Sequence, residues 1–500
     1  MLCWFSMSES NGITVSLRHA DRFFIGGDWA KPSSDAVIEV IDPANEQLFL
    51  RVAEAKEADM SRAAGAARQA FDDGPWPRLS HSQRAEYLRA IAAGLREREE
   101  DLGQIWSRES GVLHKLAQTI SDREARAFER YAGLADTFPF EEQVEPTAGE
   151  FGLIVREPVG VVGAIIPWNA PLDQITHKIA PALLAGCTVI LKAAPEAPGE
   201  AYVVAEMAEA AGLPPGVLNV VTADREVSEL LVRDPRVDKI TFTGTTAAGR
   251  RIASLCGQRI ARCTLELGGK SAAVILDDMD LATAAGTLAG AACFLSGQVC
   301  SSLTRIVVTE GRHDEMVEAV AGIFSQVRVG NPFDPQTQMG PLAASRQRDR
   351  VEGYIAKGVA QGATLAAGGG RPKHLDRGWF VEPTVFGNVD SSSAIGQEEI
   401  FGPVLSVIPA ADEQQAIAIA NDTIYGLNAS VFTSDVDRAR DVARQLRSGT
   451  VGHNAFRSDF GMAFGGFKQS GIGREGGREG LLPFLETKSV ILEGRPRRLP

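Results

Sequence analysis

The sequence predicts an α/β protein built on parallel sheets, and two patterns carry this prediction. From Val159 onward, short apolar runs alternate with longer segments in which small apolar residues recur at helical spacing. Strands that alternate with helices form right-handed crossovers and a parallel sheet covered on both faces. The alternation restarts after Leu267-Gly268-Gly269, and a chain of 500 residues is too long for one hydrophobic core. We therefore expect two α/β units that meet near these glycines.

The boundaries of the expected elements follow from the apolar runs and from the residues that stop them. Continuous apolar runs indicate buried strands, and the longer segments end at Gly186 or at Gly212, as helices do. In the first series we expect strands at 159–166, 188–191, 217–221, 238–242 and 262–265, and helices at 171–185, 197–211 and 226–233. In the second series we expect strands at 272–276 and 305–308, and the segment from Ala58 to about Phe138 should be mainly helical.

Two further strands, at 151–155 and 489–492, have no evident partner in either series. Strands placed in this way often add to a neighbouring sheet or to another subunit, because an unpaired edge is costly to leave open. They indicate an oligomerisation arm.

Composition and charge exclude several classes of function. The net charge of -13 disfavours a surface for nucleic acid or anionic membranes, and no apolar run is long enough to span a bilayer. Residues 1–7 are too short for a signal-peptide core, and either Met1 or Met7 could be the start. The cysteines show no C-x-x-C spacing, which predicts reduced thiols and a cytoplasmic location. They are Cys3, Cys187, Cys256, Cys263, Cys293 and Cys300.

Two glycine motifs resemble nucleotide-binding signatures but lack the required context. Residues 471–476 match G-x-G-x-x-G, yet no buried strand precedes them, so we interpret them as a structural or substrate-mouth loop. Gly269-Lys270-Ser271 resembles the end of a phosphate-binding loop, but Thr264 stands where that loop needs its first glycine. There is no H-E-x-x-H, and the seven histidines are scattered. We expect no metal.

A cysteine and an acid have surroundings that suit covalent catalysis. Cys300 follows Gly297-Gln298-Val299 and precedes two serines, so small neighbours leave its sulfur approachable. A nucleophilic thiolate needs that access and a lowered pKa; otherwise Cys300 is a packing residue. Glu266 lies between two leucines at the expected boundary, where a low dielectric would raise the pKa of its carboxyl and suit it to general-base work. The alternative is an ion pair with Lys270.

Two loops at the ends of expected strands could bind the charges of a substrate or cofactor. Asn169 follows the strand at 159–166, and ligands of open parallel sheets bind at the carboxyl ends of strands. Its amide can donate a hydrogen bond to an oxyanion, although Pro and Asn are also common in turns. The segment 242–249 reads as strand, glycine and helix, which directs backbone N–H groups at an anion.

Together these residues resemble the aldehyde dehydrogenase superfamily of the hydrolytic, NAD(P)-dependent type. The resemblance runs from Phe24-Ile25-Gly26-Gly27 to 486–490. The matching blocks include P-W-N-x-P, F-T-G-T, L-E-L-G-G-K-S, G-Q-V-C, E-E-I-F-G-P-V and G-G-F-K-x-S-G-x-G-R-E. Their order and spacing are highly specific.

The resemblance implies a mechanism and three structural parts. Cys300 would attack the aldehyde, Asn169 and the Cys300 backbone N–H would hold the oxyanion, and Glu266 would activate the water that hydrolyses the thioester. The fold implied is a Rossmann-like cofactor-binding domain of parallel sheet at 1–140 and 158–266, an α/β catalytic domain at 267–477, and a small β oligomerisation arm at 141–157 and 478–500. The arm would build a homodimer or homotetramer.

The resemblance also assigns binding residues. Lys192 would bind the adenosine ribose, Trp168 and Thr245 would lie along the pyrophosphate, Glu399 would hold the nicotinamide ribose and Phe401 would lie beside the ring. The full cofactor set is Ile166, Trp168, Lys192, Gly244, Thr245, Leu267, Glu399 and Phe401. The set expected to contact the aldehyde substrate is Ala170, Gln174, His177, Val299 and Ser301.

Two departures from the family pattern bear on specificity. Pro195 occupies the usual acidic position after Lys192, so the acid expected on the ribose is displaced to Glu196 or lost. We therefore expect NAD to be preferred and NADP tolerated. Many members of the family carry aromatic or aliphatic residues where this chain has Ala170, Asp173, Gln174 and His177, which predicts a wider, more polar substrate tunnel.

Two alternative functions remain. One is a CoA-acylating semialdehyde dehydrogenase, which usually lacks the acid found here as Glu266, and the other is a non-catalytic protein that retains the fold.

Overall fold

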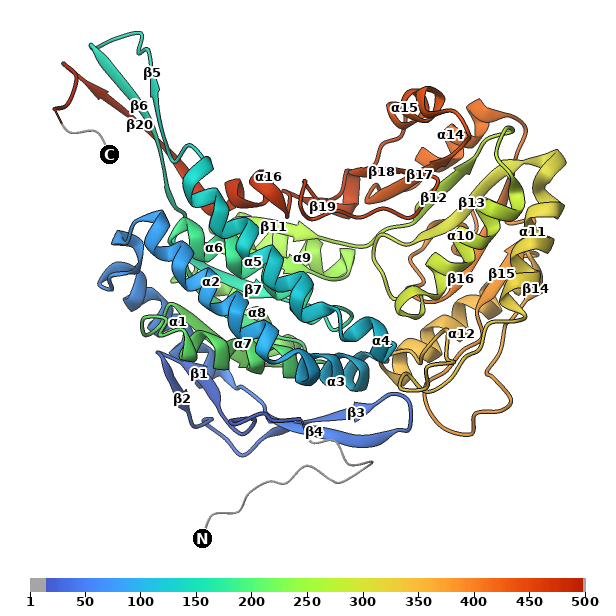
Figure 1. The fold of residues 1–500 in the computed structure, drawn as a ribbon, viewed down its shortest axis with the longest axis horizontal. Coiled ribbons are helices and arrows are strands. Elements are labelled where there is room, and N and C mark those ends of the chain that lie inside the picture. Colours follow the sequence, from blue (N-terminus) through green and yellow to red (C-terminus); the bar gives the residue numbers. More distant parts are fainter. Residues whose placement is uncertain (1–14, 498–500) are drawn as a thin grey trace.

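The structure is a computed structural model that describes residues 15–497 (Figure 1). The choice between Met1 and Met7, and Cys3, lie outside these residues. No helix within residues 15–497 is long and apolar enough to cross a membrane.

The first half of the chain forms an eight-stranded sheet whose centre is parallel. Its strand order is β19-β11-β10-β7-β8-β9-β1-β2. The five strands expected in this half are confirmed to within two residues. They are β7 (Val161–Ile165), β8 (Thr188–Ala193), β9 (Leu218–Thr222), β10 (Lys239–Thr243) and β11 (Arg262–Glu266). Three antiparallel additions complete the edges: β1 (Phe23–Ile25), β2 (Asp28–Ala30) and β19 (Gly471–Ile472).

Helices cover both faces of this sheet, which explains why its strands read as continuous apolar runs. In β7, Val162 and Ala164 face one core while Val161 and Ile165 face the other. The first core is closed by α2 (His81–Glu97), α3 (Glu99–Ser110), α5 (Ile120–Thr137), α6 (Pro171–Ala185) and α7 (Gly199–Ala210). The second is closed by α1 (Glu57–Asp72), α8 (Arg225–Arg233) and α9 (Thr246–Gln258). The helical character expected from Ala58 onward is confirmed.

A second, seven-stranded sheet follows in the order β14-β15-β16-β13-β12-β17-β18, parallel except at β14. Its strands are β12 (Ser271–Ile275), β13 (Leu303–Thr309), β14 (Thr364–Ala367), β15 (Thr384–Gly387), β16 (Val404–Ala410), β17 (Asn428–Phe432) and β18 (Thr450–His453). One face packs against α10 (Leu281–Cys293) and α11 (Glu310–Phe324). The other packs against α12 (Ser345–Ala360), α14 (Glu413–Asn421) and α15 (Val436–Ala443).

The remaining elements are short. A hairpin of β3 (Val37–Asp42) and β4 (Gln47–Ala53) lies beside the first sheet, and the small helices are α4 (His114–Ala117), α13 (Ala394–Gln397) and α16 (Gly477–Leu481).

The two strands without an evident partner pair with each other. β6 (Phe151–Pro158) and β20 (Leu485–Leu492) form an antiparallel ladder from Phe151↔Leu492 to Leu485↔Pro158. β5 (Glu141–Val144), which the sequence did not indicate, adds to the far side of β6. Figure 1 shows this three-stranded sheet projecting away from both large sheets. The ladder satisfies one edge of each long strand, so the two strands are partners of each other, and neither joins either of the large sheets.

A buried guanidinium ties the second sheet to the loop between the two units. Arg305 on β13 is 1% exposed. It donates to the carbonyl oxygens of Lys270 (2.8 Å), Ile419 (2.9 Å) and Ala420 (2.8 Å). The last two carbonyls lie in the final turn of α14, where Ile419 O also accepts from Asp422 N at 3.2 Å, so one side chain adds to the cap of a helix and fixes the backbone that follows Gly269.

We expect Arg305→Lys to destabilise the protein. A lysine cannot supply the planar fork that reaches three carbonyls, and a buried carbonyl left unpaired costs about 1–3 kcal/mol. The free energy of unfolding in urea should fall by about 2–4 kcal/mol. Arg440→Lys on α15 is the matched control, because that side chain is 69% exposed. An equal urea midpoint for the two variants would contradict this account.

Candidate active site

A cavity of about 540 Å³ lies where the first unit faces the loops of the second. It contains Cys300, Asn169 and all five residues expected to contact substrate. Its lining is Trp106, Arg123, Glu124, Arg130, Asn169, Ala170, Asp173, Gln174, His177, Phe294, Leu295, Val299, Cys300, Ser301, Phe456, Ser458, Asp459, Phe460, Gly461 and Phe464.

A strained turn places Cys300 at this cavity. Directly after α10, Leu295, Ser296 and Gly297 have φ values of 49°, 54° and 71°, a left-handed run that non-glycine residues rarely adopt. A Cβ at Gly297 would lie 2.3 Å from the carbonyl carbon of Gly402, so only glycine fits there. The turn reverses the chain and leaves the Cys300 side chain half-buried in the cavity wall.

The electrostatic surroundings of Cys300 differ from the sequence expectation. Burial raises the pKa of its thiol, and the carboxylates of Glu399, Glu266 and Asp173 raise it further. The chain alone therefore does not lower the pKa of the Cys300 thiol, because acids rather than cations surround the sulfur. Attack by Cys300 requires a proton acceptor or a positive charge that arrives with a ligand.

Asn169 lies immediately before α6 and is held from both sides. Its Nδ2 donates to the backbone oxygen of Gln298 at 2.9 Å, and its own backbone oxygen accepts from Trp106 Nε1 at 2.9 Å. The first bond ties Asn169 to the loop that carries Cys300. The Asn169 amide carries a second N–H, and Asn169 and Cys300 line the same cavity, which suits this pair to hold an oxyanion.

Glu266 is the last residue of β11 and lies behind the cavity rather than in its wall. Glu266 is 2% exposed, and both of its carboxylate oxygens lack hydrogen-bond partners among the described residues. Burial and the neighbouring Glu475 raise the pKa of the Glu266 carboxyl well above its ordinary value. A Cβ at Gly465 would lie 2.6 Å from Glu266 Oε1, so that glycine leaves room for the carboxylate.

Glu266 makes no ion pair with Lys270, so the alternative for this acid is wrong. Within the described residues, Lys270 Nζ is itself buried without a hydrogen-bond partner, and burial lowers the pKa of Lys270 to about 7.

The G-x-G-x-x-G segment serves as support beneath the site. Gly471 and Ile472 form β19, which pairs with β11 at Glu266 and Leu265. Glu475 of the same segment is buried and accepts from Lys178 Nζ at 2.7 Å. The preference for a structural loop over a dinucleotide motif is consistent with this placement.

The residues expected to bind cofactor gather at the carboxyl ends of neighbouring strands. The pairs Ile165↔Lys192, Phe242↔Ile165 and Thr243↔Glu266 bring the ends of β7, β8, β10 and β11 side by side. Ile166, Lys192, Gly244 and Leu267 therefore share one edge of the sheet, where ligands of parallel sheets bind.

The chemistry of this edge fits a dinucleotide. Thr245 is the N-cap of α9, its hydroxyl accepts from Ala248 N, and the start of the helix presents N–H groups suited to a pyrophosphate. Burial lowers the pKa of Lys192 to about 8, and Glu196 and Asp224 act on its ammonium through space. A buried ammonium of this kind favours the hydroxyls or phosphate of a ligand.

At the other end of the edge, Glu399 accepts from Gly269 N at 3.3 Å, and burial raises the pKa of Glu399 to about 7. Phe401 has a φ of 62° and sets its ring edge-on to Trp168, with centroids 5.5 Å apart.

The Glu196 carboxylate is not free to interact with Lys192 alone, because another cation pairs with it. It forms an ion pair with Arg346, whose side chain is 61% exposed. The acid that could discriminate against a 2′-phosphate is thus partly neutralised.

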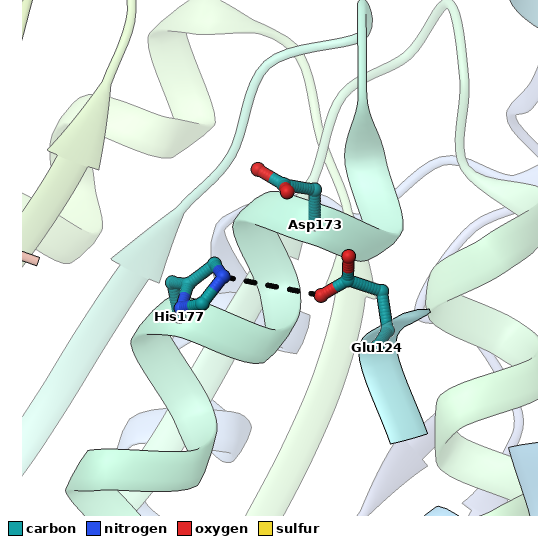
Figure 2. A group of neighbouring side chains, drawn as sticks. All are labelled: Glu124, Asp173 and His177. Carbon is teal, nitrogen blue, oxygen red and sulfur yellow. Dashed lines mark ion pairs between the residues drawn. The ribbon is translucent and has the colours of Figure 1, made fainter. Parts of the chain in front are cut away.

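Figure 2 shows a polar group in the cavity wall that sequence reasoning found only in part. Asp173, Gln174 and His177 share one face of α6, and Glu124 joins them from α5. Ligand atoms of Glu124, Asp173 and His177 lie within 4.8 Å of one another, a spacing that scattered histidines did not predict. Arg123 pairs with Glu124 at 2.8 Å and with Asp173 at 3.3 Å, so its guanidinium already offsets the negative charge of these two acids.

Sequence reasoning missed Glu124 and Lys178. The sequence did contain a signal for Lys178, because it is a charged residue in a helix that is mostly apolar and is buried along almost its whole length. Glu124 gave none, because the sequence does not distinguish it from Asp122, Glu129 and Asp136 on the same helix, which are not buried.

Comparison with known proteins places this geometry in a family. The model of the aldehyde dehydrogenase family matches residues 29–490. Geranial dehydrogenase of Castellaniella defragrans is 43% identical over 96% of this chain and 100% of its own, and 3-succinoylsemialdehyde-pyridine dehydrogenase of a Pseudomonas species is 40% identical over 95% and 99%.

Solved structures agree throughout the fold. An aldehyde dehydrogenase of Mycobacterium tuberculosis complexed with NAD+ has a TM-score of 0.93 and 46% identity, covering 95% of this chain and 99% of that one. One from Pseudomonas syringae, complexed with NAD+ and octanal, has a TM-score of 0.93 and 39% identity, covering 98% and 100%. The chain belongs to the aldehyde dehydrogenase family.

Proposed function

We propose that the chain oxidises an aldehyde to a carboxylic acid with NAD, through a thioester on Cys300. The observation that carries this proposal is the cavity in which Cys300 and Asn169 lie together, at the sheet edge that fits a dinucleotide. Named relatives act on geranial and betaine aldehyde, and structural neighbours contain NAD+. Both facts support an NAD-dependent aldehyde dehydrogenase.

In the first half of the reaction, Cys300 gives its thiol proton to solvent, and its sulfur forms a bond to the aldehyde carbon. The Asn169 amide and the Cys300 backbone N–H donate to the resulting oxyanion. NAD, when bound, supplies the acceptor for the hydride that leaves that carbon. Lys192, Thr245, Glu399 and Phe401 would hold it.

In the second half, Glu266 takes a proton from water as the water oxygen attacks the thioester. The carbon–sulfur bond breaks, the acid leaves and Cys300 is regenerated. The burial of Glu266 suits this step, because a carboxyl with a raised pKa is a stronger base once it is ionised.

We propose that the chain divides into three parts, each with its own role in this function. Residues 1–140 and 158–266 bind cofactor, 267–477 carry the nucleophile, and 141–157 with 478–500 form an arm for a homodimer or homotetramer. The separate sheets support the division, apart from β19 (Gly471–Ile472), which joins the first sheet, and the edge position of β20 in the three-stranded sheet supports the arm. The free thiols support a reducing compartment such as the cytoplasm.

Glu266→Gln should bind cofactor, complete at most one turnover and stall as an acyl-enzyme, because the amide cannot accept a proton from water. Mass spectrometry should find the adduct on Cys300. In the unmodified protein, the rate of thioester hydrolysis should rise with pH as the Glu266 carboxyl ionises.

Cys300→Ala should abolish turnover, whereas Cys293→Ala, at another half-buried cysteine, should retain it. An undiminished steady-state rate in Glu266→Gln would assign the base elsewhere, and full activity in Cys300→Ala would refute the mechanism.

The kcat/KM ratio should favour NAD over NADP by less than about 100-fold, or roughly 2.7 kcal/mol. Pro195 replaces the usual acid, and Arg346 pairs with Glu196, so repulsion of a 2′-phosphate is weak. Kinetics with both cofactors on one aldehyde test this, and Glu196→Gln should improve use of NADP.

Glu315→Gln, at an exposed position on α11, is the matched control for Glu196. A preference above about 1,000-fold would show that Glu196 discriminates despite its ion pair.

The active form should be a dimer or tetramer. β20 leaves one edge open and exposes Ile491 by 59%, a combination that favours pairing with another chain. Light scattering should give a multiple of 53.4 kDa at micromolar concentration. Ile491→Lys should weaken the assembly, and Val359→Lys, at a site 53% exposed on α12, should not. A monomer at that concentration contradicts the proposal.

A further inference from the structure

The substrate cavity has two chemically different walls. Trp106, Phe294, Leu295, Phe456, Phe460 and Phe464 supply apolar surface. Asp173, Gln174 and His177 supply a polar face from α6, with Glu124 beside them. An aldehyde with a purely hydrocarbon tail would offer no partner to those polar atoms of this wall that the chain itself leaves unpaired.

Most polar atoms of this wall are already paired within the chain. Arg123 donates to Glu124 Oε1 at 2.8 Å and to Asp173 Oδ1 at 3.3 Å. Gln174 Nε2 donates to Asp173 Oδ2 at 3.0 Å. Both oxygens of Asp173 are therefore occupied. The groups left over are Glu124 Oε2 and the imidazole of His177.

Glu124 Oε2 and His177 Nε2 face each other at 4.0 Å (Figure 2). Their side chains are only 1% and 3% exposed. Glu124 Oε2 and His177 Nδ1 have no hydrogen-bond partner among the described residues. A separation of 4.0 Å is too long for a direct hydrogen bond. A single oxygen between the two atoms could bond to both, at about 2.8 Å each.

The imidazole cannot swing away to relieve this gap. Its ring stacks on Phe460, with centroids 4.2 Å apart, and meets Tyr131 edge-on at 6.1 Å. The gap is therefore a fixed feature of the cavity wall.

The charges around the gap between Glu124 and His177 determine which kind of oxygen can bind there. Burial lowers the pKa of His177 to about 4, so its ring is neutral near neutral pH. Arg123 offsets the acids, and Arg130 also lines the cavity, so the wall is not a strong attractant for a metal ion or an organic cation. Burial raises the pKa of Glu124 to about 7, and a neutral hydroxyl matches either state of that carboxyl, because it accepts from the His177 ring N–H and can donate to, or accept from, Glu124 Oε2.

We propose that Glu124 and His177 form a subsite for a hydroxyl group on the aldehyde substrate, and that the enzyme selects hydroxylated aldehydes. The proposal rests on the aldehyde oxidation proposed above. A site that hydrogen-bonds a substrate hydroxyl disfavours the analogue that lacks it, because the buried partners then stay unpaired.

The test compares matched aldehydes in which a hydroxyl replaces a methyl group of similar size. Hydroxyphenyl and methylphenyl forms of benzaldehyde, phenylacetaldehyde and 3-phenylpropanal vary the distance between the two ends. With NAD, one spacer length should show a kcat/KM preference for the hydroxyl member of about 10- to 100-fold. Most of the difference should lie in KM, since the bond forms in the ground state and in the transition state alike.

Two variants identify the residues. Glu124→Gln and His177→Phe should each bring the ratio of kcat/KM for the hydroxyl member to kcat/KM for the methyl member close to one, whatever happens to the rate with either aldehyde alone. His177→Phe keeps a ring against Phe460. The matched control is His81→Phe, because His81 also stacks on a phenylalanine, Phe140, with centroids 3.4 Å apart, but lies at the start of α2 outside the cavity.

The outcomes separate the subsite from the reaction. Oxidation of the methyl members establishes the dehydrogenase whatever the hydroxyl comparison gives. Equal kcat/KM for both members at every spacer length overturns the subsite, as does a preference that survives in both variants. Loss of the preference on addition of EDTA overturns it too, because a bound cation would then hold the hydroxyl.

Discussion

The site depends on how closely two glycines approach their neighbours in the loop between the two sheets. A Cβ at Gly268 would lie 2.3 Å from Glu399 Oε2, and one at Gly269 would lie 2.5 Å from the carbonyl oxygen of Cys300. This backbone therefore touches both a cofactor-site acid and the nucleophile's own peptide. Glu266 stands two residues before Gly268, and Arg305 fixes the carbonyl one residue after Gly269. The residues proposed as general base, nucleophile and ribose acid thus all adjoin one segment of backbone.

The same region holds several polar groups that the fold does not satisfy. Glu266 and Lys270 are buried without hydrogen-bond partners among residues 15–497. Groups of this kind cost stability, of the order of 1–3 kcal/mol each. They lie beside the nucleophile and the ribose acid, whereas Lys178, nearby and equally buried, is fully engaged with Gln174, Thr243 and Glu475. The contrast is consistent with a structural role for Lys178 and with the roles at the active site that we propose for the region of Glu266.

The fold could be predicted where local pattern decides it. The strands of the first sheet are buried on both faces, so their apolar runs stand out, and glycines mark the ends of α6 and α7. β19 could not be predicted, because two residues carry no periodic signal and its partner β11 lies far away in sequence. The pairing of β6 with β20 had the same difficulty. Pairings between distant strands depend on tertiary packing that no local window contains.

For the site, sequence located residues whose chemistry is unusual for their neighbours, such as Glu266 between leucines. It could not give the electrostatics of Cys300, since the carboxylates that raise the pKa of its thiol come from three separate segments. Nor could it show that Glu196 would be engaged by Arg346. Both facts depend on which side chains meet across the domain boundary.

The late arrival of β19 has a consequence for synthesis on the ribosome. β11 is made first, and the strand that covers its outer edge follows roughly 200 residues later. At about 5 to 20 residues per second, that interval is on the order of 10 to 40 s. During this time the first sheet can assemble around its parallel centre, but the edge that carries Glu266 lacks its final strand. An open edge is a template for association with other nascent chains. The growing polypeptide therefore passes through a stage at which the edge of β11 is an unpaired strand edge, where binding by a chaperone would prevent association with other chains.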